Sequence, residues 1–508
     1  MNKVWMKIGM KRRLALLFVG VLVAAFCAAA AAAEKDTLIV ADQYDAHTMD
    51  PASNSLPTAR ACYAIYDTLL FIRDGGPAVP GLAESWEFLS DTAYKFNLRK
   101  GVKFHNGDEM KASDVRYSIM RATTDIGAEI RTYSQNVKDV EVVDDYTVIL
   151  HLKEPDYSFF STLGHNWAAV ISEKATEAAG ENYAMNPVGT GPFKFVSWQK
   201  GDRYVLERFD DYWGPKVKYK TLIVRSIPEP TSRTIELESG GVDIAFPIIT
   251  NDIKRIEENE NLVLYRVTQN STTFMGFNMS KPPFDDVRVR KAILAALDTV
   301  GIQAAVWRGV GKTPTSILPN AVKYSIQPEV PPHKQDVELA KKLLAEAGVT
   351  TLKFDVWTNE RKERVDMATI IQAQLADLGI TTEIKVLEWG AFLSGLLEKS
   401  HGAFILGWAN TVTDPNYAIA GLLESTAGNN YTATNDKQID ELLRKGRGVM
   451  DGPEREAIYK ELQRYINETA PMIFLHNDES IAGTQKNVRG FTPSPSELHS
   501  FREVYFED

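Results

Sequence analysis

The sequence predicts an α/β protein. Between residues 352 and 408 strand and helix patterns alternate, with strands at 352–357, 380–389 and 402–408 and helices at 363–379 and 390–399. A strand–helix–strand–helix–strand series of these lengths forms parallel strands joined by right-handed crossovers. The first 270 residues are instead rich in short strands whose apolar and polar side chains alternate, which indicates antiparallel pairing.

The chain begins with a pattern typical of a secretory leader. Five basic residues precede the apolar run at 14–26, and small residues continue through Ala33. The run is too short to span a membrane. We therefore expect residues 1–33 to be a signal peptide, and the mature protein to be periplasmic. A lipid anchor on Cys27 is the less favoured alternative, because Phe26 stands where lipoprotein processing needs a small side chain.

The remaining part has the bulk properties of an ordinary acidic globular protein. Removal of the leader leaves about 475 residues and takes the formal charge from −10 to −15. That length corresponds to two or three domains, and the acidic charge argues against nucleic acid or an anionic membrane as a partner. Cys62 is then the only cysteine, so no internal disulfide can form, and we expect Cys62 to be a buried small hydrophobe.

The elements follow one another in a consistent order. An apolar strand is expected at 37–43, antiparallel hairpin material with Lys-Gly and Asn-Gly turns at 91–108, and further strands at 146–155 and 221–227. After about residue 280 the helices become regular. The segments 285–298 and 336–348 each have one apolar face, and the second begins at an Asp and ends at a Gly.

The ends of the predicted parallel strands indicate a ligand site. All carboxyl ends of such strands point to one side of the sheet, and ligands bind in the crevice there. The segment WTNER (357–361) leaves the first strand and WANTVTDPNY (408–417) leaves the third. The candidate ligand-binding residues on these segments are Arg361, Trp408, Asn410, Thr411 and Asp414, with Arg364 nearby.

Two of these residues have an equally good structural interpretation. Asp414 precedes Pro415 and a predicted helix at 417–425, and Asp-Pro is a common way for a helix to begin. Trp408 follows an apolar strand, so core packing explains it as well as a ligand does.

Several segments, taken together, resemble a known family. They follow in order along nearly the whole mature chain: MDPAS (49–53), YDTLL (66–70), PGLAESWEF (80–88), LRKGVKFHNGD (98–108), SDVRYS (113–118), VGTGPFKFVSW (188–198), FNMSKPPFDDVRVRKAILAALD (277–298), AQLADLGI (373–380) and RYINETAPMIFL (464–475). The chain resembles the extracytoplasmic solute-binding proteins of family 5, the dipeptide, oligopeptide and glutathione receptors of ABC importers. PGLAESWEF followed by LRKGVKFHNG is the most specific part.

The resemblance implies a two-lobed periplasmic binding protein, cluster C type II-like, with an extra N-terminal subdomain. The lobes would close over a ligand and dock on permease subunits in the inner membrane. The implied division is lobe I at 34–270 plus 482–508, with the subdomain inserted at about 78–186, lobe II at 271–481, and hinge crossings near 271–280 and 478–484.

The resemblance also implies a ligand class. GWxxxTxDP is similar to the glutathione- and dipeptide-like branch, so a small peptide is expected. Family members usually place an Asp three residues after this Trp, where it pairs with the peptide's α-ammonium group. Thr411 stands there instead, and Asp414 is the candidate substitute. Arg361 best matches the family's arginine that grips the ligand carboxylate through its two-pronged donor geometry.

Other functions are less well supported. The same fold binds longer oligopeptides, nickel or heme chelates and oligosaccharides in other members of the family. The eight His residues show no ligand-spaced pair, so direct metal binding is disfavoured. Neither H-E-x-x-H nor G-x-S-x-G occurs, which leaves a secreted hydrolase as a weak alternative. We therefore expect a monomeric binding protein rather than an enzyme, with no cofactor.

Overall fold

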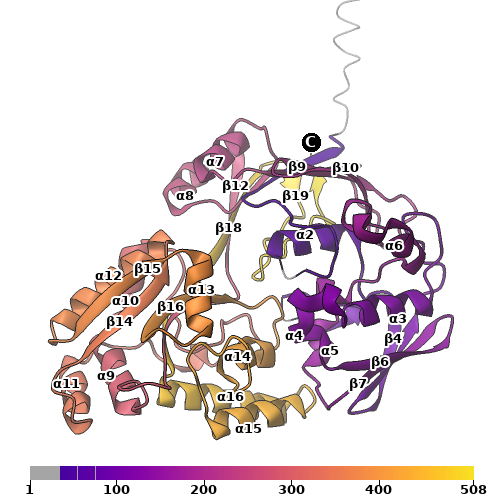
Figure 1. Cartoon of the computed structure of the whole chain (residues 1–508). Coiled ribbons are helices and arrows are strands. Elements are labelled where there is room, and N and C mark those ends of the chain that lie inside the picture. Colours follow the sequence, from indigo (N-terminus) through magenta and orange to yellow (C-terminus); the bar gives the residue numbers. More distant parts are fainter. Residues whose placement is uncertain (1–34, 54, 75, 508) are drawn as a thin grey trace, which may run out of the picture.

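We analysed a computed structural model, which describes residues 35–53, 55–74 and 76–507. The predicted signal peptide at 1–33, including Cys27, lies outside the described residues. Within the described part no helix is long and apolar enough to cross a bilayer. Two large sheets and one smaller sheet organise the chain, with helices packed around them (Figure 1).

The first large sheet has seven strands in the order β12-β18-β11-β1-β10-β9-β8. Its central strand β1 runs parallel to β10 and β11, and the other pairs are antiparallel. The strands expected at 37–43 and 221–227 are confirmed as β1 and β10. The bounds are β1 Thr37–Asp42, β8 Phe193–Gln199, β9 Arg203–Arg208, β10 Thr221–Ser226, β11 Ile244–Phe246, β12 Leu262–Thr268 and β18 Glu479–Gln485, with helices α2 Leu56–Ile65, α7 Pro230–Glu238 and α8 Ile253–Glu257.

A four-stranded antiparallel sheet, in the order β4-β5-β7-β6, lies to one side of the first sheet (Figure 1). Residues 91–108 contribute only one strand, β5, which pairs with β4 and β7. After β5 an isolated bridge joins Lys103 to Glu109, and the side chains of Val102 and Phe104 are buried. The elements here are β4 Ala83–Ser90, β5 Ala93–Leu98, β6 Val137–Asp144, β7 Thr147–Leu152, α3 Ala112–Arg121, α4 Arg131–Ser134, α5 Phe159–Thr162 and α6 Glu173–Ala179.

The second large sheet has five strands in the order β15-β14-β16-β13-β17. β14 lies between β15 and β16 and is parallel to both, which confirms the predicted strand–helix–strand–helix–strand unit, whereas β13 and β17 are antiparallel additions. The bounds are β13 Ser271–Phe277, β14 Lys353–Asn359, β15 Thr381–Leu387, β16 Ala403–Ala409 and β17 Met472–His476, with α9 Val287–Ala296, α10 Thr299–Trp307, α11 Val337–Glu346, α12 Lys362–Ala376, α13 Trp389–Leu397, α14 Pro415–Leu423, α15 Lys437–Arg447 and α16 Pro453–Thr469.

Two short crossings connect the large sheets. β12 ends at Thr268 and β13 begins at Ser271, and on the return β17 ends at His476 and β18 begins at Glu479. The Asn477 side chain donates to the Ser271 carbonyl over 2.7 Å and ties the crossings together. Small two-stranded ribbons complete the described fold: β2 Leu70–Phe71 with β3 Val79–Pro80, and β19 Val488–Arg489 with β20 Tyr505–Phe506. Cys62 is buried and unpaired, as expected.

Candidate ligand-binding site

The two segments that the sequence singles out leave the same edge of the second large sheet. Because β14 and β16 are parallel neighbours, Asn359 and Ala409 both lie at the carboxyl-end edge. β13 begins there too, with Ser271 opposite Ala409. This edge therefore faces the crossings and the four-stranded sheet beyond them.

A cavity of about 760 Å³ opens at this edge. We call it the interlobe cavity. Its wall combines the loop after β16, α14, the first crossing, α4 and the C-terminal loop; the lining includes Arg131, Tyr133, Asp156, Gln269, Asn270, Trp408, Asn410, Thr411, Asn416, Tyr417, Gly421, Glu424, Arg447 and Glu497. The size falls within the usual range for small-molecule sites. Of the five candidate residues, Trp408, Asn410 and Thr411 line it.

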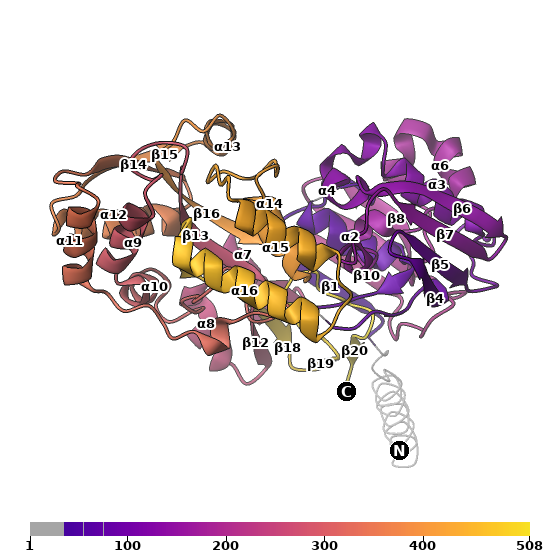
Figure 2. The same cartoon turned by 90° about the horizontal axis from the view of Figure 1, so that it is seen from below.

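Direct contacts span the interlobe cavity. The hydroxyl groups of Tyr133 on α4 and Thr411 are 3.1 Å apart. The Tyr157 amide donates to the Arg447 carbonyl over 2.9 Å, just before α5 and at the end of α15. Accordingly, α4 and α5 face α14 and α15 in Figure 1, and α4 again lies beside α14 in Figure 2. The two walls of the interlobe cavity are therefore in direct contact in this structure.

Three asparagines that line the interlobe cavity have buried amide atoms without a hydrogen-bond partner. Within the described chain, no hydrogen-bond partner is found for the buried Nδ2 and Oδ1 of Asn270, Oδ1 of Asn410 or Oδ1 of Asn416. Each buried polar group without a partner costs about 1–3 kcal/mol. Other such groups in the described chain, including the indole N–H of Trp167, lie away from this cavity. The three asparagines therefore place unused donors and acceptors beside the cavity.

The backbone fixes two of these amides in place. The Asn410 N–H donates to the Asn270 carbonyl over 2.7 Å, and the Asn270 N–H donates to the Pro495 carbonyl, also over 2.7 Å. The loop after β16, the first crossing and the C-terminal loop are thus joined at one point. These backbone hydrogen bonds hold the side chains of Asn270 and Asn410 in fixed positions relative to each other.

Trp408 both packs against the core and lines the interlobe cavity, so its position is compatible with core packing and with ligand contact. It pairs with Thr272 on β13 and packs partly buried against the core of the second sheet. A Cβ on Gly421 of α14 would lie 3.2 Å from the indole Cζ2, so the glycine leaves room for the ring. Trp408 also lines the interlobe cavity.

The contacts of Asp414 favour the N-cap interpretation. Its carboxylate accepts from the Asn416 N–H over 2.9 Å at the start of α14 and forms a 2.9 Å ion pair with Arg455 on α16. The two side chains are only 5% and 3% exposed. Asp414 is not among the residues that line the interlobe cavity. Its charge neutralises a buried guanidinium group, which would be costly to leave unpaired.

Arg361 lies beside the second crossing rather than in the interlobe cavity. Its side chain is 47% exposed, its Nε donates to Glu363 over 3.2 Å, and its Nη2 is 4.0 Å from Asp478. The nearby Arg364 is buried, and its Nη1 donates to Asn359 over 3.0 Å. Burial, followed by the like charge of Arg361, lowers the pKa of Arg364 to about 10.

Comparison with known proteins identifies the family. Residues 78–430 match the family model described as bacterial extracellular solute-binding proteins, family 5. The chain belongs to this family. It is 29% identical to the dipeptide-binding protein of Escherichia coli over 87% of this chain and 89% of that protein, and 30% identical to heme-binding protein A of Haemophilus influenzae over 87% and 86%.

Solved structures share the two-lobed architecture. The periplasmic binding protein DppA of Helicobacter pylori, in complex with the peptide STSA, aligns with a TM-score of 0.81 at 28% identity, covering 94% of this chain and 99% of that one. A dipeptide-binding protein from Pseudoalteromonas, in complex with Met-Leu, aligns with a TM-score of 0.78 at 25% identity, covering 93% and 100%. The two-lobed α/β fold is therefore confirmed for this solute-binding protein.

Sequence reasoning missed several residues of the interlobe cavity. Arg131 on α4 lines it with a 52% exposed side chain and pairs with Asp125 over 3.3 Å. It gave no sequence signal, because α4 is only four residues long and shows no apolar periodicity. Asn416 follows the Asp-Pro motif and Asn270 adjoins the expected crossing, so both stand next to features that the sequence does show.

Three acidic residues also line the interlobe cavity. Glu424 forms an ion pair with Arg447, and Glu497 accepts from Gln269 over 2.8 Å. Asp156 lies deeper; burial, and secondarily the like charge of Asp414, raises the pKa of Asp156 to about 6. In the described part of the chain, no group of three or more His, Cys, Asp or Glu side chains is placed to hold a metal ion.

Proposed function

We propose that this solute-binding protein captures small peptides in the interlobe cavity, in the periplasm, and delivers them to the permease subunits of an ABC importer. The observation that carries the proposal is the set of buried amides of Asn270, Asn410 and Asn416 around one cavity of about 760 Å³. A peptide backbone offers alternating N–H donors and C=O acceptors, which is the chemistry that unused amide groups need.

The names of the relatives support peptides as the first ligand class. Dipeptide-binding proteins and a receptor solved with the peptide STSA are among the matches, and glutathione-binding proteins match as well. A heme-binding relative is also among them. The affinity of the protein for metal or heme chelates, longer oligopeptides and sugars should therefore be compared with its affinity for small peptides.

Lobe closure is the second part of the proposal. The sequence predicts lobe I at about 34–270 plus 482–508, lobe II at 271–481 and hinge crossings near 271–280 and 478–484. Because strands β13 and β18 occupy most of those two segments, we place the hinge at the short crossings 269–270 and 477–478, with the whole of β18 in lobe I. Contacts such as Tyr133 to Thr411 form only when the lobes meet. A ligand that contacts both walls then stabilises the closed form through its differential affinity.

Two arginines are candidates for binding the carboxylate of the peptide. Arg361 is the candidate from sequence and lies at the hinge, whereas Arg131 lines the interlobe cavity directly. Either guanidinium group has the planar donor geometry for a carboxylate. Single alanine variants of each, compared in the same assay, distinguish them.

The ligand class is tested with protein freed of copurified molecules by unfolding and refolding. Calorimetric titration with dipeptides, a tripeptide, glutathione, a nonapeptide and hemin gives the ranking, and mass spectrometry of the molecules released on unfolding identifies the natural guest. We expect dipeptides or glutathione to bind most tightly and to be recovered intact. Binding of hemin or a sugar in the absence of any peptide binding would overturn the proposal.

A further inference from the structure

The loop after β16 inserts an apolar side chain into a core that belongs to the other lobe. The buried apolar cluster around the four-stranded sheet is formed by residues 69–170, with a single exception among the described residues, Val412. Val412 is only 5% exposed. Tyr417 of α14, partly buried, packs against the same cluster. Lobe II therefore completes an apolar core of lobe I.

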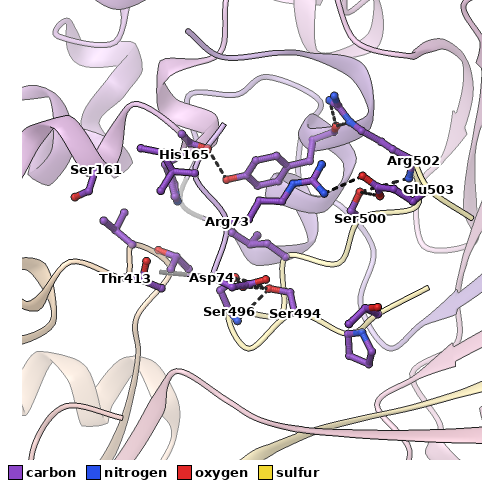
Figure 3. A pocket seen from close by; sticks show the side chains of 18 of the residues that line it. Arg73, Asp74, Ser161, His165, Thr413, Ser494, Ser496, Ser500, Arg502 and Glu503 are labelled. Atoms are coloured by element: carbon purple, nitrogen blue, oxygen red, sulfur yellow. Dashed lines mark hydrogen bonds and ion pairs between the residues drawn. The ribbon is translucent and has the colours of Figure 1, made fainter. Parts of the chain in front are cut away.

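A small cavity of about 250 Å³ lies between this loop and lobe I. Figure 3 shows Thr413 of the loop, with Ser161 and His165, in and just after α5, above it. The imidazole of His165 in turn packs against the ring of Tyr133 on α4, with the ring centroids 4.7 Å apart. The loop therefore lies next to both α4 and α5 of lobe I.

A buried polar contact joins the lobes at a second place. The Nη2 group of Arg455 on α16 donates to the Ser158 hydroxyl, just before α5, over 3.0 Å. Both residues are buried, and Asp414 neutralises the same guanidinium group. Neither Arg455 nor Ser158 lines the interlobe cavity. This contact between the lobes therefore does not involve a guest in that cavity.

We propose that Val412 and Arg455 form a clasp that shifts the guest-free protein toward the closed form, Val412 by entering the core of lobe I and Arg455 by binding Ser158. The inference rests on the lobe closure of the proposed function but not on the identity of the guest. Opening the lobes exposes Val412 to water and removes the Ser158 acceptor from Arg455. The burial of an apolar side chain and a hydrogen bond to a guanidinium group thus both favour closure.

The clasp predicts a uniform effect on affinity. If only the closed form binds tightly, the apparent affinity is the intrinsic affinity multiplied by the fraction of closed protein. Weakening the clasp therefore lowers the affinity for every guest by the same factor. A side chain that contacts the guest directly instead changes the differences in affinity between guests.

The test compares Ser158→Ala, Val412→Ala and the double variant with the parent. The first removes the acceptor for Arg455, and the second removes two buried methyl groups. Each should lower the closure equilibrium constant roughly tenfold, and the double variant should lower it about a hundredfold because the two sites are separate.

Two measurements follow the closure equilibrium. Calorimetry gives the affinities for alanyl-alanine and for glutathione, and small-angle X-ray scattering gives the radius of gyration of the guest-free protein. We expect the double variant to bind both peptides more weakly by the same factor, roughly tenfold. Its guest-free radius of gyration should exceed that of the parent, and saturation with either peptide should restore the smaller value.

Two control variants weaken lobe I without touching the clasp. Ser134→Ala removes a buried hydroxyl group that donates to the Ala122 carbonyl over 2.8 Å within lobe I. Val140→Ala removes the same two methyl groups as Val412→Ala from the same apolar cluster. Both controls should lower the stability in urea unfolding but keep the affinities and the radius of gyration of the parent.

Three outcomes overturn the inference. The double variant keeps the affinities and the radius of gyration of the parent, the control variants lose affinity to the same extent, or the loss is confined to one of the two peptides. A parent that binds no peptide refutes the proposed function instead. Scattering from the guest-free parent and double variant then still decides whether the clasp exists.

Discussion

The ion pair between Asp414 and Arg455 gives a quantitative prediction for Asp414→Asn. Both side chains are almost fully buried, and their closest contact is 2.9 Å. Removing one partner of a buried pair typically costs about 3–5 kcal/mol, because the other charge stays buried and unpaired. Asparagine is as good an N-cap as aspartate, so the cap on the Asn416 N–H persists. We expect the free energy of unfolding to fall by about 3 kcal/mol.

The matched control is Asp436→Asn. Asp436 caps α15, accepting from the Gln438 and Ile439 N–H groups, and its Oδ2 accepts from the Tyr465 hydroxyl over 2.9 Å. Among the described residues it forms no ion pair with a buried arginine. Losing its charge should cost only about 0.3–1 kcal/mol through the helix dipole. The difference between the two variants therefore isolates the buried ion pair from the cap.

Urea unfolding of ligand-free protein, followed by circular dichroism, measures both variants, and calorimetry measures their affinity for alanyl-alanine. Because Asp414 does not line the interlobe cavity, peptide affinity should be close to that of the parent. The reasoning is refuted if Asp414→Asn is no less stable than Asp436→Asn but loses peptide binding. Asp414 would then act as the ligand-binding acid after all.

Three further predictions address the candidate site. Arg361→Ala should weaken binding about tenfold if Arg361 holds the carboxylate, and an equal calorimetric affinity in this variant with a loss in Arg131→Ala would move that role to Arg131. Asn270→Ala should also lower peptide affinity, since Asn270 lines the interlobe cavity and its amide has no partner within the described chain; unchanged affinity would exclude it from recognition. Asp156 should contribute stability below about pH 4 that is lost as pH rises through about 6, because its pKa is raised from 3.8 in the folded state. Asp156→Asn should therefore gain stability relative to the parent between pH 4 and pH 7, by up to about 3 kcal/mol; a pH-independent difference in urea unfolding would contradict this.

The sequence by itself determined the local architecture. Periodicity located β14, α12, β15, α13 and β16 within a few residues, because each element has its own apolar pattern and its own stop signal. The pattern also predicted that these strands run parallel, whereas the order β15-β14-β16 came from the structure. The segment 408–414 could be assigned to the carboxyl-end edge for the same reason, and the structure places it there.

Only the tertiary structure decided which side chains face the cavity. Asp414 and Asn416 are two residues apart, yet one pairs with Arg455 and the other lines the interlobe cavity. Asp74 and Thr411 are more than 300 positions apart and line the same cavity of about 250 Å³. The local sequence pattern shows which face of an element is apolar. The partner of a polar side chain depends instead on which distant segment packs against it, and that contact exists only in the folded chain.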